Sequence, residues 1–118
     1  MRVFVTGTGR CGTTTFARAM QHATNYTAAH EGRTRYHGPA DLEFPDDHVE
    51  SNPRLGLLLG PLVARYPSAL YVHLCRPKKD VVDSWVRRGP RWGPGLWAPF
   101  SAGVKATPAN LRGLAELC

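Results

Sequence analysis

The sequence predicts a small α/β fold in which a parallel β-sheet is flanked by helices. The chain opens with a β-branched run that ends in a glycine-rich turn, and stretches with strand and helix patterns alternate after it. With 118 residues, 42% of them hydrophobic, the chain can fill one hydrophobic core but not two. We therefore expect residues 1–118 to form a single domain that is small for this class.

The first predicted unit consists of a strand, a turn and a helix. Residues 2–6 (RVFVT) favour a buried strand, and residues 13–22 follow with a helical pattern. The apolar face of this predicted helix consists of Phe16, Ala19 and Met20. A helix that begins directly after such a turn aims its first N–H groups and the positive end of its dipole at the turn. This arrangement is suited to binding an anion.

The middle of the chain predicts a strand, a loop and a helix. Residues 25–29 (NYTAA) are compatible with a second strand, whereas residues 32–52 are polar, contain prolines and favour a loop. Asn52 before a proline is typical of a helix N-cap, so we expect a helix at residues 53–65. The apolar face of that helix would contain Leu55, Leu58, Leu59, Leu62 and Val63.

The last predicted unit is a strand at residues 69–74 (ALYVHL) followed by a helix at residues 78–88. The inward positions of this helix would be Val81, Val82, Trp85 and Val86. Residues 89–103 are rich in Gly, Pro and Trp and favour a surface loop, and residues 108–117 favour a short helix. We expect the C-terminal segment 89–118 to be irregular as a whole.

Composition and charge argue against several classes of protein. No apolar run approaches the roughly 20 residues that span a bilayer, and the N-terminus lacks the pattern of a signal peptide. The cysteines, Cys11, Cys75 and Cys118, have no metal-type spacing and indicate reduced thiols. The net charge of +6 suits an anionic ligand, but nucleic-acid binding has no motif behind it. We therefore expect a cytoplasmic protein without a metal site, a membrane anchor or a nucleic-acid partner.

The turn GTGRCGTTT fits more than one phosphate-binding template. Gly7, Gly9 and Gly12 spell the dinucleotide pattern GxGxxG, for which Glu31 could supply the ribose carboxylate. The same stretch is similar to the loop of nucleoside triphosphatases, but Thr13 occupies the position of their lysine. Those enzymes also need an acidic residue at a strand end to handle Mg²⁺, and the last predicted strand leads into an arginine instead. An NAD(P)-binding Rossmann-type oxidoreductase stays as the alternative.

A second candidate anion site follows the last predicted strand. Arg76 stands just beyond this strand, and Ser84 lies in the helix after it. An arginine binds a phosphate through paired, charge-assisted hydrogen bonds, and a nearby hydroxyl adds a donor. Because ligands of parallel sheets bind beyond the carboxyl ends of the strands, we expect Arg76, His30 and Glu31 to lie at the same edge as the glycine-rich turn. Two phosphate sites without a metal-binding acid suit 3′-phosphoadenosine 5′-phosphosulfate (PAPS).

Together these motifs resemble those of the sulfotransferases, bacterial members in particular. The resemblance rests on Arg10-Cys11-Gly12-Thr13-Thr14, on RPKKDVVDSW from Arg76 to Trp85, and on the stretch ESNPRLGLLLGPLVARYPSALYVHL before it. It covers residue 1 to about residue 88. The resemblance implies a three-layer, P-loop NTPase-like fold. It also implies PAPS as the donor and transfer of a sulfuryl group to a hydroxyl or amine of a small-molecule or glycan acceptor.

The resemblance further implies roles for single residues. Arg10 would stabilise the negative charge that builds on the bridging oxygen as the sulfuryl group leaves. Arg76 and Ser84 would bind the 3′-phosphate. The acceptor must lose a proton to a general base, for which we favour Glu31 over the neighbouring His30. The 5′-phosphosulfate would be held by Gly9, Arg10, Cys11, Gly12, Thr13 and Thr14.

Beyond residue 88 the resemblance stops. Sulfotransferases continue into a basic loop that closes over the nucleotide, and residues 89–118 contain no copy of it. The sequence therefore indicates a short or C-terminally truncated member of the family, and a non-catalytic nucleotide-binding remnant is a further alternative. The acceptor pocket would be built by residues 32–52 and 89–103, which carry no motif. A homodimer would cover outer helices that lack a partner.

Overall fold

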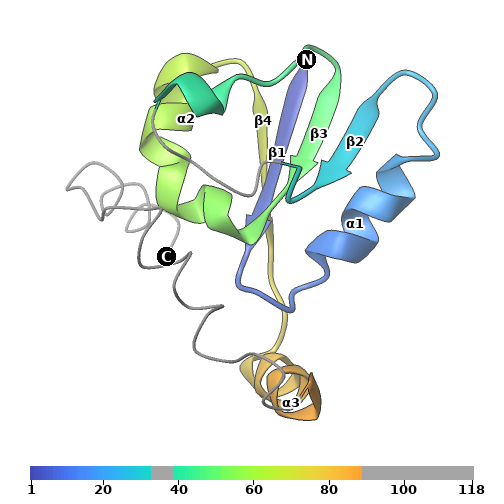
Figure 1. The fold of residues 1–118 in the computed structure, drawn as a ribbon. Coiled ribbons are helices and arrows are strands. Elements are labelled where there is room, and N and C mark those ends of the chain that lie inside the picture. The colour runs from blue at the N-terminus through green and yellow to red at the C-terminus, as the bar shows by residue number, and fades with distance from the viewer. Residues whose placement is uncertain (33–38, 89–118) are drawn as a thin grey trace.

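The computed structural model describes residues 1–32 and 39–88, so the expectations for residues 89–103 and 108–117 lie outside the described residues. Figure 1 shows the arrangement of the helices and strands. In chain order they are β1 (Arg2–Gly7), α1 (Thr13–Met20), β2 (Thr27–His30), the 3₁₀ helix η1 (Pro39–Leu42), β3 (His48–Ser51), the 3₁₀ helix η2 (Pro53–Leu58), α2 (Leu59–Arg65), β4 (Leu70–Leu74) and α3 (Lys78–Arg88).

The described strands form one four-stranded parallel sheet in the order β2-β3-β1-β4. This confirms the predicted α/β class with a parallel sheet. The strand β1 lies inside the sheet, with β3 on one side and β4 on the other. Since all the pairs are parallel, the carboxyl ends of the strands gather at one edge, which is the lower edge in Figure 1.

The strand β3 shows that the expectation of a loop throughout residues 32–52 was wrong. Its sequence HVES contains a single apolar residue, Val49, and therefore lacks the alternation by which a half-buried strand is recognised. Its last two residues are nevertheless buried, because hydrogen bonds satisfy their side chains. Glu50 accepts a hydrogen bond from the N–H of Gly32, and the Ser51 hydroxyl donates to the carbonyl oxygen of Thr13.

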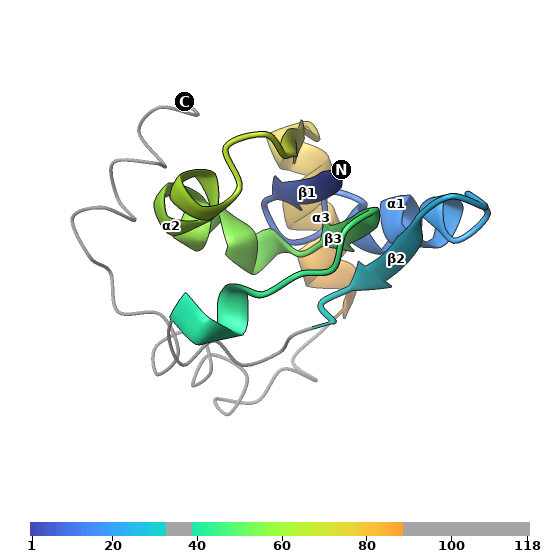
Figure 2. The same ribbon diagram turned by 90° about the horizontal axis from the view of Figure 1, so that it is seen from above.

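Helices cover both faces of the sheet, and Figure 2 shows α1 and α2 on opposite sides of it. On one face, Phe16 and Met20 of α1 pack against a cluster made of Val3, Val5 and Val49. The other face carries a larger core, in which the rings of Phe4 and Phe44 meet edge to face with their centroids 5.1 Å apart. Its buried residues are Phe4, Leu42, Phe44, Leu55 and Leu62.

Two predicted helices are found with altered details. The helix expected at residues 13–22 ends at Met20, and Ala17 rather than Ala19 is its buried alanine. The helix expected at residues 53–65 is divided into η2 and α2. Asn52 caps it as predicted, because its Oδ1 accepts from the N–H of Arg54 at 3.0 Å. Its apolar face is buried at Leu55, Leu59 and Leu62, half-buried at Leu58 and exposed at Val63.

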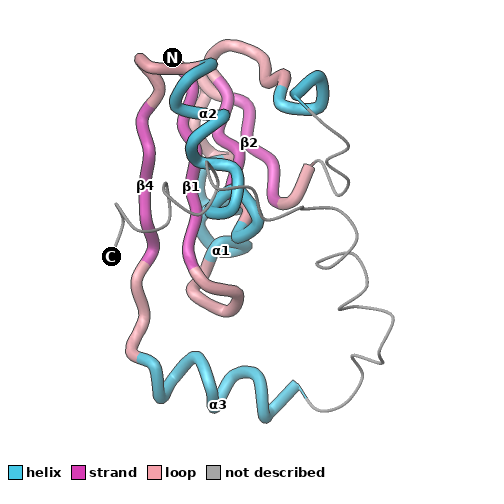
Figure 3. The backbone as a smooth tube through the Cα atoms, turned by 90° about the vertical axis from the view of Figure 1, so that its left-hand side faces the viewer, coloured by secondary structure: helices cyan, strands magenta, loops and turns pink. Residues whose placement is uncertain are grey.

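The helix α3 has the predicted bounds, but most of the side chains predicted to point inward are exposed. Of the four positions predicted to point inward, Val81 is half-buried, whereas Val82, Trp85 and Val86 are exposed, Val86 at 72%. Ser84 is instead buried, with 7% of its surface exposed. The reason is the place of the helix. Figure 3 shows α3 beyond the carboxyl ends of the strands, so it does not pack on a face of the sheet. The side that meets the turn there carries the buried Ser84 beside the edge of the Trp85 ring, and the apolar pattern of the sequence does not predict such a mixed contact.

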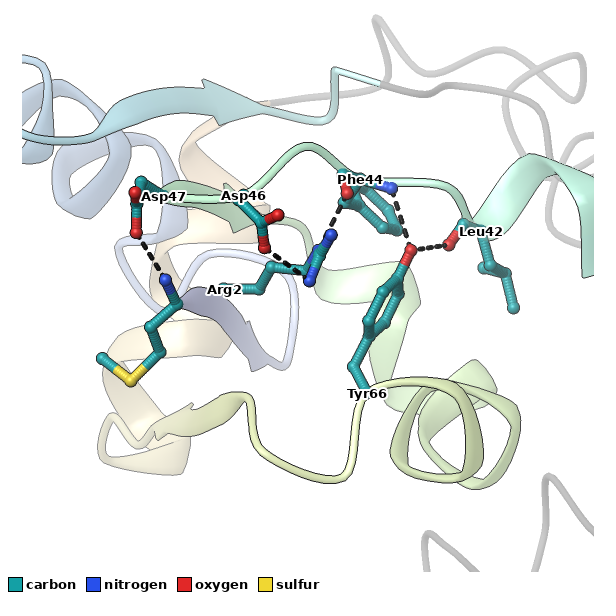
Figure 4. A network of polar contacts seen from close by, with 7 residues as sticks. Arg2, Leu42, Phe44, Asp46, Asp47 and Tyr66 are labelled. Carbon is teal, nitrogen blue, oxygen red and sulfur yellow. Dashed lines mark hydrogen bonds and ion pairs between the residues drawn. The ribbon is translucent and has the colours of Figure 1, made fainter.

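At the amino ends of the strands, polar side chains join β1 to the segment that leads into β3 (Figure 4). The hydroxyl of Tyr66 donates to the carbonyl oxygen of Leu42 at 2.9 Å and accepts from the N–H of Phe44 at 3.1 Å. The guanidinium of Arg2 lies 4.5 Å from the centroid of the Tyr66 ring, donates to the carbonyl oxygen of Phe44 at 2.8 Å and pairs with Asp46 at 2.7 Å. Tyr66 therefore fixes the chain before β3.

We predict that Tyr66→Phe lowers the free energy of unfolding by about 1–3 kcal/mol, because it leaves a part-buried N–H and a carbonyl group without their shared partner. Urea denaturation at neutral pH measures the loss. The control is Tyr26→Phe, since the half-buried Tyr26 packs on the opposite face of the sheet. The free energy of unfolding of Tyr26→Phe should fall by less than about 0.5 kcal/mol. Equal losses in the two variants would contradict the role given to the Tyr66 hydroxyl.

Candidate functional site

The candidate site is built around the turn between β1 and α1. Cys11 closes the turn, with its N–H donating to the carbonyl oxygen of Thr8 at 3.2 Å. Arg10 and Gly12 have positive φ angles of 74° and 99°. The chain thus turns sharply at Gly12, and α1 begins without a side-chain cap on its first N–H groups. An uncapped helix start with a glycine before it can offer these N–H groups to an anion.

The turn packs closely against its neighbours. A Cβ atom at Gly7 would lie 2.6 Å from the carbonyl oxygen of Leu74, so a side chain there would collide with β4. A Cβ atom at Gly9 would lie 3.0 Å from the ring of Trp85 in α3. The sulfur of Cys11 is a free thiol 2.8 Å from the hydroxyl oxygen of Thr8. The turn is therefore held between β4 and α3.

Arg10, Arg76 and Ser84 are brought together, although Arg10 is far from the other two in the sequence. The Nε of Arg10 donates to the Ser84 hydroxyl at 3.0 Å. Arg76 in turn donates from a terminal nitrogen to the backbone carbonyl oxygen of Arg10, also at 3.0 Å. Two cationic side chains and a hydroxyl thus lie together beside the start of α1. Their shared positive charge favours a ligand with more than one negative charge.

The predicted pair His30 and Glu31, at the end of β2, divides into two different environments. The Nε2 atom of His30 lies 3.1 Å from the hydroxyl oxygens of both Thr13 and Thr14. Glu31 has a positive φ of 50°, and its N–H donates to the carbonyl oxygen of Ser51 at 3.2 Å. Within residues 1–32 and 39–88 its carboxylate has no hydrogen-bond or ion-pair partner. His30 therefore faces the turn, while Glu31 keeps a carboxylate available for another partner.

Sequence reasoning missed the residues at the end of β3. The Glu50 side chain is 2% exposed. Its carboxylate accepts from the N–H of Gly32 at 3.0 Å and lies 3.5 Å from the Nε2 of His48. Burial raises the pKa of Glu50, against the opposing effect of these hydrogen bonds. Glu50 thereby holds the backbone of Gly32, the residue after Glu31. The signal that could have revealed β3 is the helix start at Asn52, because a strand normally precedes a helix in an α/β alternation.

Because its pKa is raised in the folded protein, Glu50 should stabilise the fold fully below the pKa of an unfolded glutamate and lose this contribution as the pH rises through the folded value. We therefore predict that the free energy of unfolding of the wild type falls relative to that of Glu50→Gln over the pH range from about 4 upward. Urea denaturation of both proteins across this range measures the difference. The same comparison in a His48→Gln background removes the contribution of the neighbouring imidazole. The prediction is refuted if the free energy of unfolding of the wild type, minus that of Glu50→Gln, stays constant or increases with pH.

Comparisons with family models, with curated proteins and with solved structures find no match for this chain. Among the described residues, no group of three or more His, Cys, Asp or Glu side chains could hold a metal ion. In the same part of the chain, every helix is too short or too polar to cross a membrane. Residues 33–38 and 89–103, to which the sequence assigns parts of the acceptor pocket, lie outside the described residues. The functional argument therefore rests on the geometry around the turn.

Proposed function

We propose that this chain is a sulfotransferase, which moves a sulfuryl group from PAPS to a hydroxyl or amine of a small-molecule or glycan acceptor. The observation that carries the proposal is the meeting of Arg10, Arg76 and Ser84 beside the uncapped start of α1. The sequence motifs predict two anion sites, one in the turn and one after β4. The contacts join them into one region, and the donor carries its two phosphate-bearing groups on one ribose.

The first of these sites would bind the 5′-phosphosulfate. Its donors are the backbone N–H groups of the turn and of the first turn of α1, together with the hydroxyls of Thr13 and Thr14. Thr14 is exposed, while Thr13 is buried, with 4% of its surface exposed. Arg10 has only its Nε engaged with a described side chain, which leaves its two terminal nitrogens for the ligand. These groups suit a compact anion with several oxygens.

The second site would bind the 3′-phosphate through Arg76 and Ser84. Arg76 is exposed, and a single one of its terminal nitrogens bonds to a described residue. The Ser84 hydroxyl accepts from Arg10 and still has its own hydrogen to donate, because a hydroxyl has one donor and two acceptor positions. Ser84 can therefore contact a phosphate without giving up Arg10. This contact would connect the two sites.

In the proposed reaction, the acceptor oxygen or nitrogen attacks the sulfur atom in line with the bond to the bridging oxygen. The new bond to sulfur forms as the bond from sulfur to the bridging oxygen breaks, and adenosine 3′,5′-bisphosphate leaves. Glu31 takes the acceptor proton, since its carboxylate has no partner among the described residues. Arg10 stabilises the charge that collects on the bridging oxygen. The fold that we propose for this chemistry is of the three-layer, P-loop NTPase-like kind.

The strand order weighs against the dinucleotide alternative. In the dinucleotide-binding fold, with strand order 3-2-1-4-5-6, the second strand pairs with the first and brings its terminal carboxylate next to the glycine-rich turn. Here β3 lies between β1 and β2, so Glu31 stands one strand further away. The strand beside β1 ends instead in Ser51, whose hydroxyl is bonded to Thr13. A non-catalytic nucleotide-binding protein stays as the alternative, because a binding measurement alone does not distinguish it from a sulfotransferase.

Isothermal calorimetry of the purified chain tests the proposal. We predict micromolar binding of adenosine 3′,5′-bisphosphate, with weaker binding of NAD⁺ and of ATP with Mg²⁺. Arg76→Ala should weaken bisphosphate binding roughly ten- to hundredfold, because it removes charge-assisted hydrogen bonds to the 3′-phosphate. Arg87→Ala is the matched control, since it removes an exposed arginine from α3 and should leave affinity unchanged.

Binding of NAD⁺ in preference to the bisphosphate would support the oxidoreductase instead. Equal affinities of Arg76→Ala and Arg87→Ala would refute the second phosphate site. For the catalytic step, Arg10→Ala should slow transfer to a hydroxyl or amine acceptor far more than it weakens binding of the product nucleotide. A chain that binds the bisphosphate and transfers nothing to a panel of such acceptors would be a nucleotide-binding protein without this activity.

A further inference from the structure

His30 contacts the turn in an unusual way. A single nitrogen atom, Nε2, lies 3.1 Å from the hydroxyl oxygens of two successive residues, Thr13 and Thr14. The backbone keeps this contact in place. His30 is paired in register with Ser51 in the neighbouring strand, and the Ser51 hydroxyl donates to the carbonyl oxygen of Thr13 at 2.9 Å. The ring is thus held against the first turn of α1 from the strand side.

Counting hydrogens shows what this contact decides. An imidazole nitrogen carries either a hydrogen or a lone pair, and each threonine hydroxyl has one hydrogen to donate. If Nε2 carries the lone pair, a hydroxyl hydrogen of Thr13 or Thr14 points at His30 and is withheld from a ligand. If Nε2 carries the hydrogen, the ring donates to the hydroxyl oxygens, and both threonines keep their hydrogens for an anion. The state of one nitrogen atom therefore sets the donor capacity of the turn.

We infer that His30 is a positioning residue of the nucleotide site, which donates from Nε2 to Thr13 and Thr14 and so directs their hydrogens to the 5′-phosphosulfate. The inference rests on the proposed function and separates the two candidates for the general base. The Nε2 atom of His30 is engaged with the turn, whereas the carboxylate of Glu31 has no described partner. Glu31 then acts as the general base that takes the acceptor proton, and His30 contributes to nucleotide affinity.

Linkage makes the inference measurable. If a bound anion requires a donating Nε2, then a residue that always donates from this position must bind the anion as well as histidine does, and one that cannot donate must bind it less well. Glutamine places an amide nitrogen near the position of Nε2, and leucine fills similar space without a donor. The two substitutions therefore separate hydrogen bonding from packing.

The experiment measures adenosine 3′,5′-bisphosphate affinity by calorimetry for the full chain and its variants. His30→Leu should weaken binding about tenfold, the equivalent of one hydrogen bond, and His30→Gln should stay within about threefold of the wild type. His22→Leu is the control, because His22 is an exposed histidine beyond the far end of α1. In a Thr13→Val, Thr14→Val background, His30→Leu should cost no further affinity. Glu31→Gln should leave affinity unchanged and abolish transfer.

Nitrogen-15 spectra of the histidine side chains give a second readout that does not depend on any variant folding. In the wild type with bisphosphate bound, Nε2 of His30 should carry a hydrogen. A bound complex in which this nitrogen is unprotonated would overturn the inference, and so would equal losses in His30→Leu and His30→Gln. If the bisphosphate affinity of both variants equalled that of the wild type, the inference would be overturned, but the proposed function would stand. Failure of the wild type to bind the bisphosphate would contradict the proposed function itself and this inference with it.

Discussion

The pairing of β1 with a strand on each side is the constraint on which the rest of this structure depends. Because β3 and β4 both run parallel to β1, the turns that follow the strands meet at one edge. The turn after β1 must then pass close to β4, and the carbonyl oxygen of Leu74 leaves no room for a side chain at Gly7. The same pairing places the end of β3 beneath the first residue of α1, where Ser51 holds Thr13. The geometry of the candidate anion site is thus a consequence of the sheet.

The sequence predicted those parts of the fold that are governed by apolar patterns or by strong turn signals. The strands β1 and β4, the cap at Asn52 and the bounds of α3 follow from such signals, and the structure contains them. The strand β3 escaped prediction because its burial is achieved by hydrogen bonds, which a pattern of hydrophobicity does not register. The orientation of α3 was wrong for a related reason. Its buried residue is Ser84, which finds its partner in Arg10, a contact between distant parts of the chain.

The candidate site was accessible from the sequence only as separate fragments. The positions of Arg10, Arg76 and Ser84 in their motifs indicated anion binding, but their mutual contacts depend on how α3 meets the turn. His30, the last residue of β2, and Glu31 after it were both candidates for the general base in the sequence, with Glu31 favoured. The structure gives them different surroundings, because a strand aims successive side chains at opposite faces and the chain then turns sharply at Glu31, where φ is positive. Glu50 was missed entirely, since a buried carboxylate needs partners that no local pattern reveals.

The polar attachment of α3 has a consequence for the energetics of the site. The helix leaves Val82, Trp85 and Val86 exposed and meets the turn through the contact of Arg10 with Ser84 and of Gly9 with Trp85. A segment attached with so little apolar burial opens locally at a low free-energy cost compared with unfolding of the whole domain. A ligand that bridges Arg10, Arg76 and Ser84 would add its binding energy to that local equilibrium. With such a ligand bound, amide hydrogen exchange in α3 would therefore slow, while exchange in β1 would follow the stability of the core.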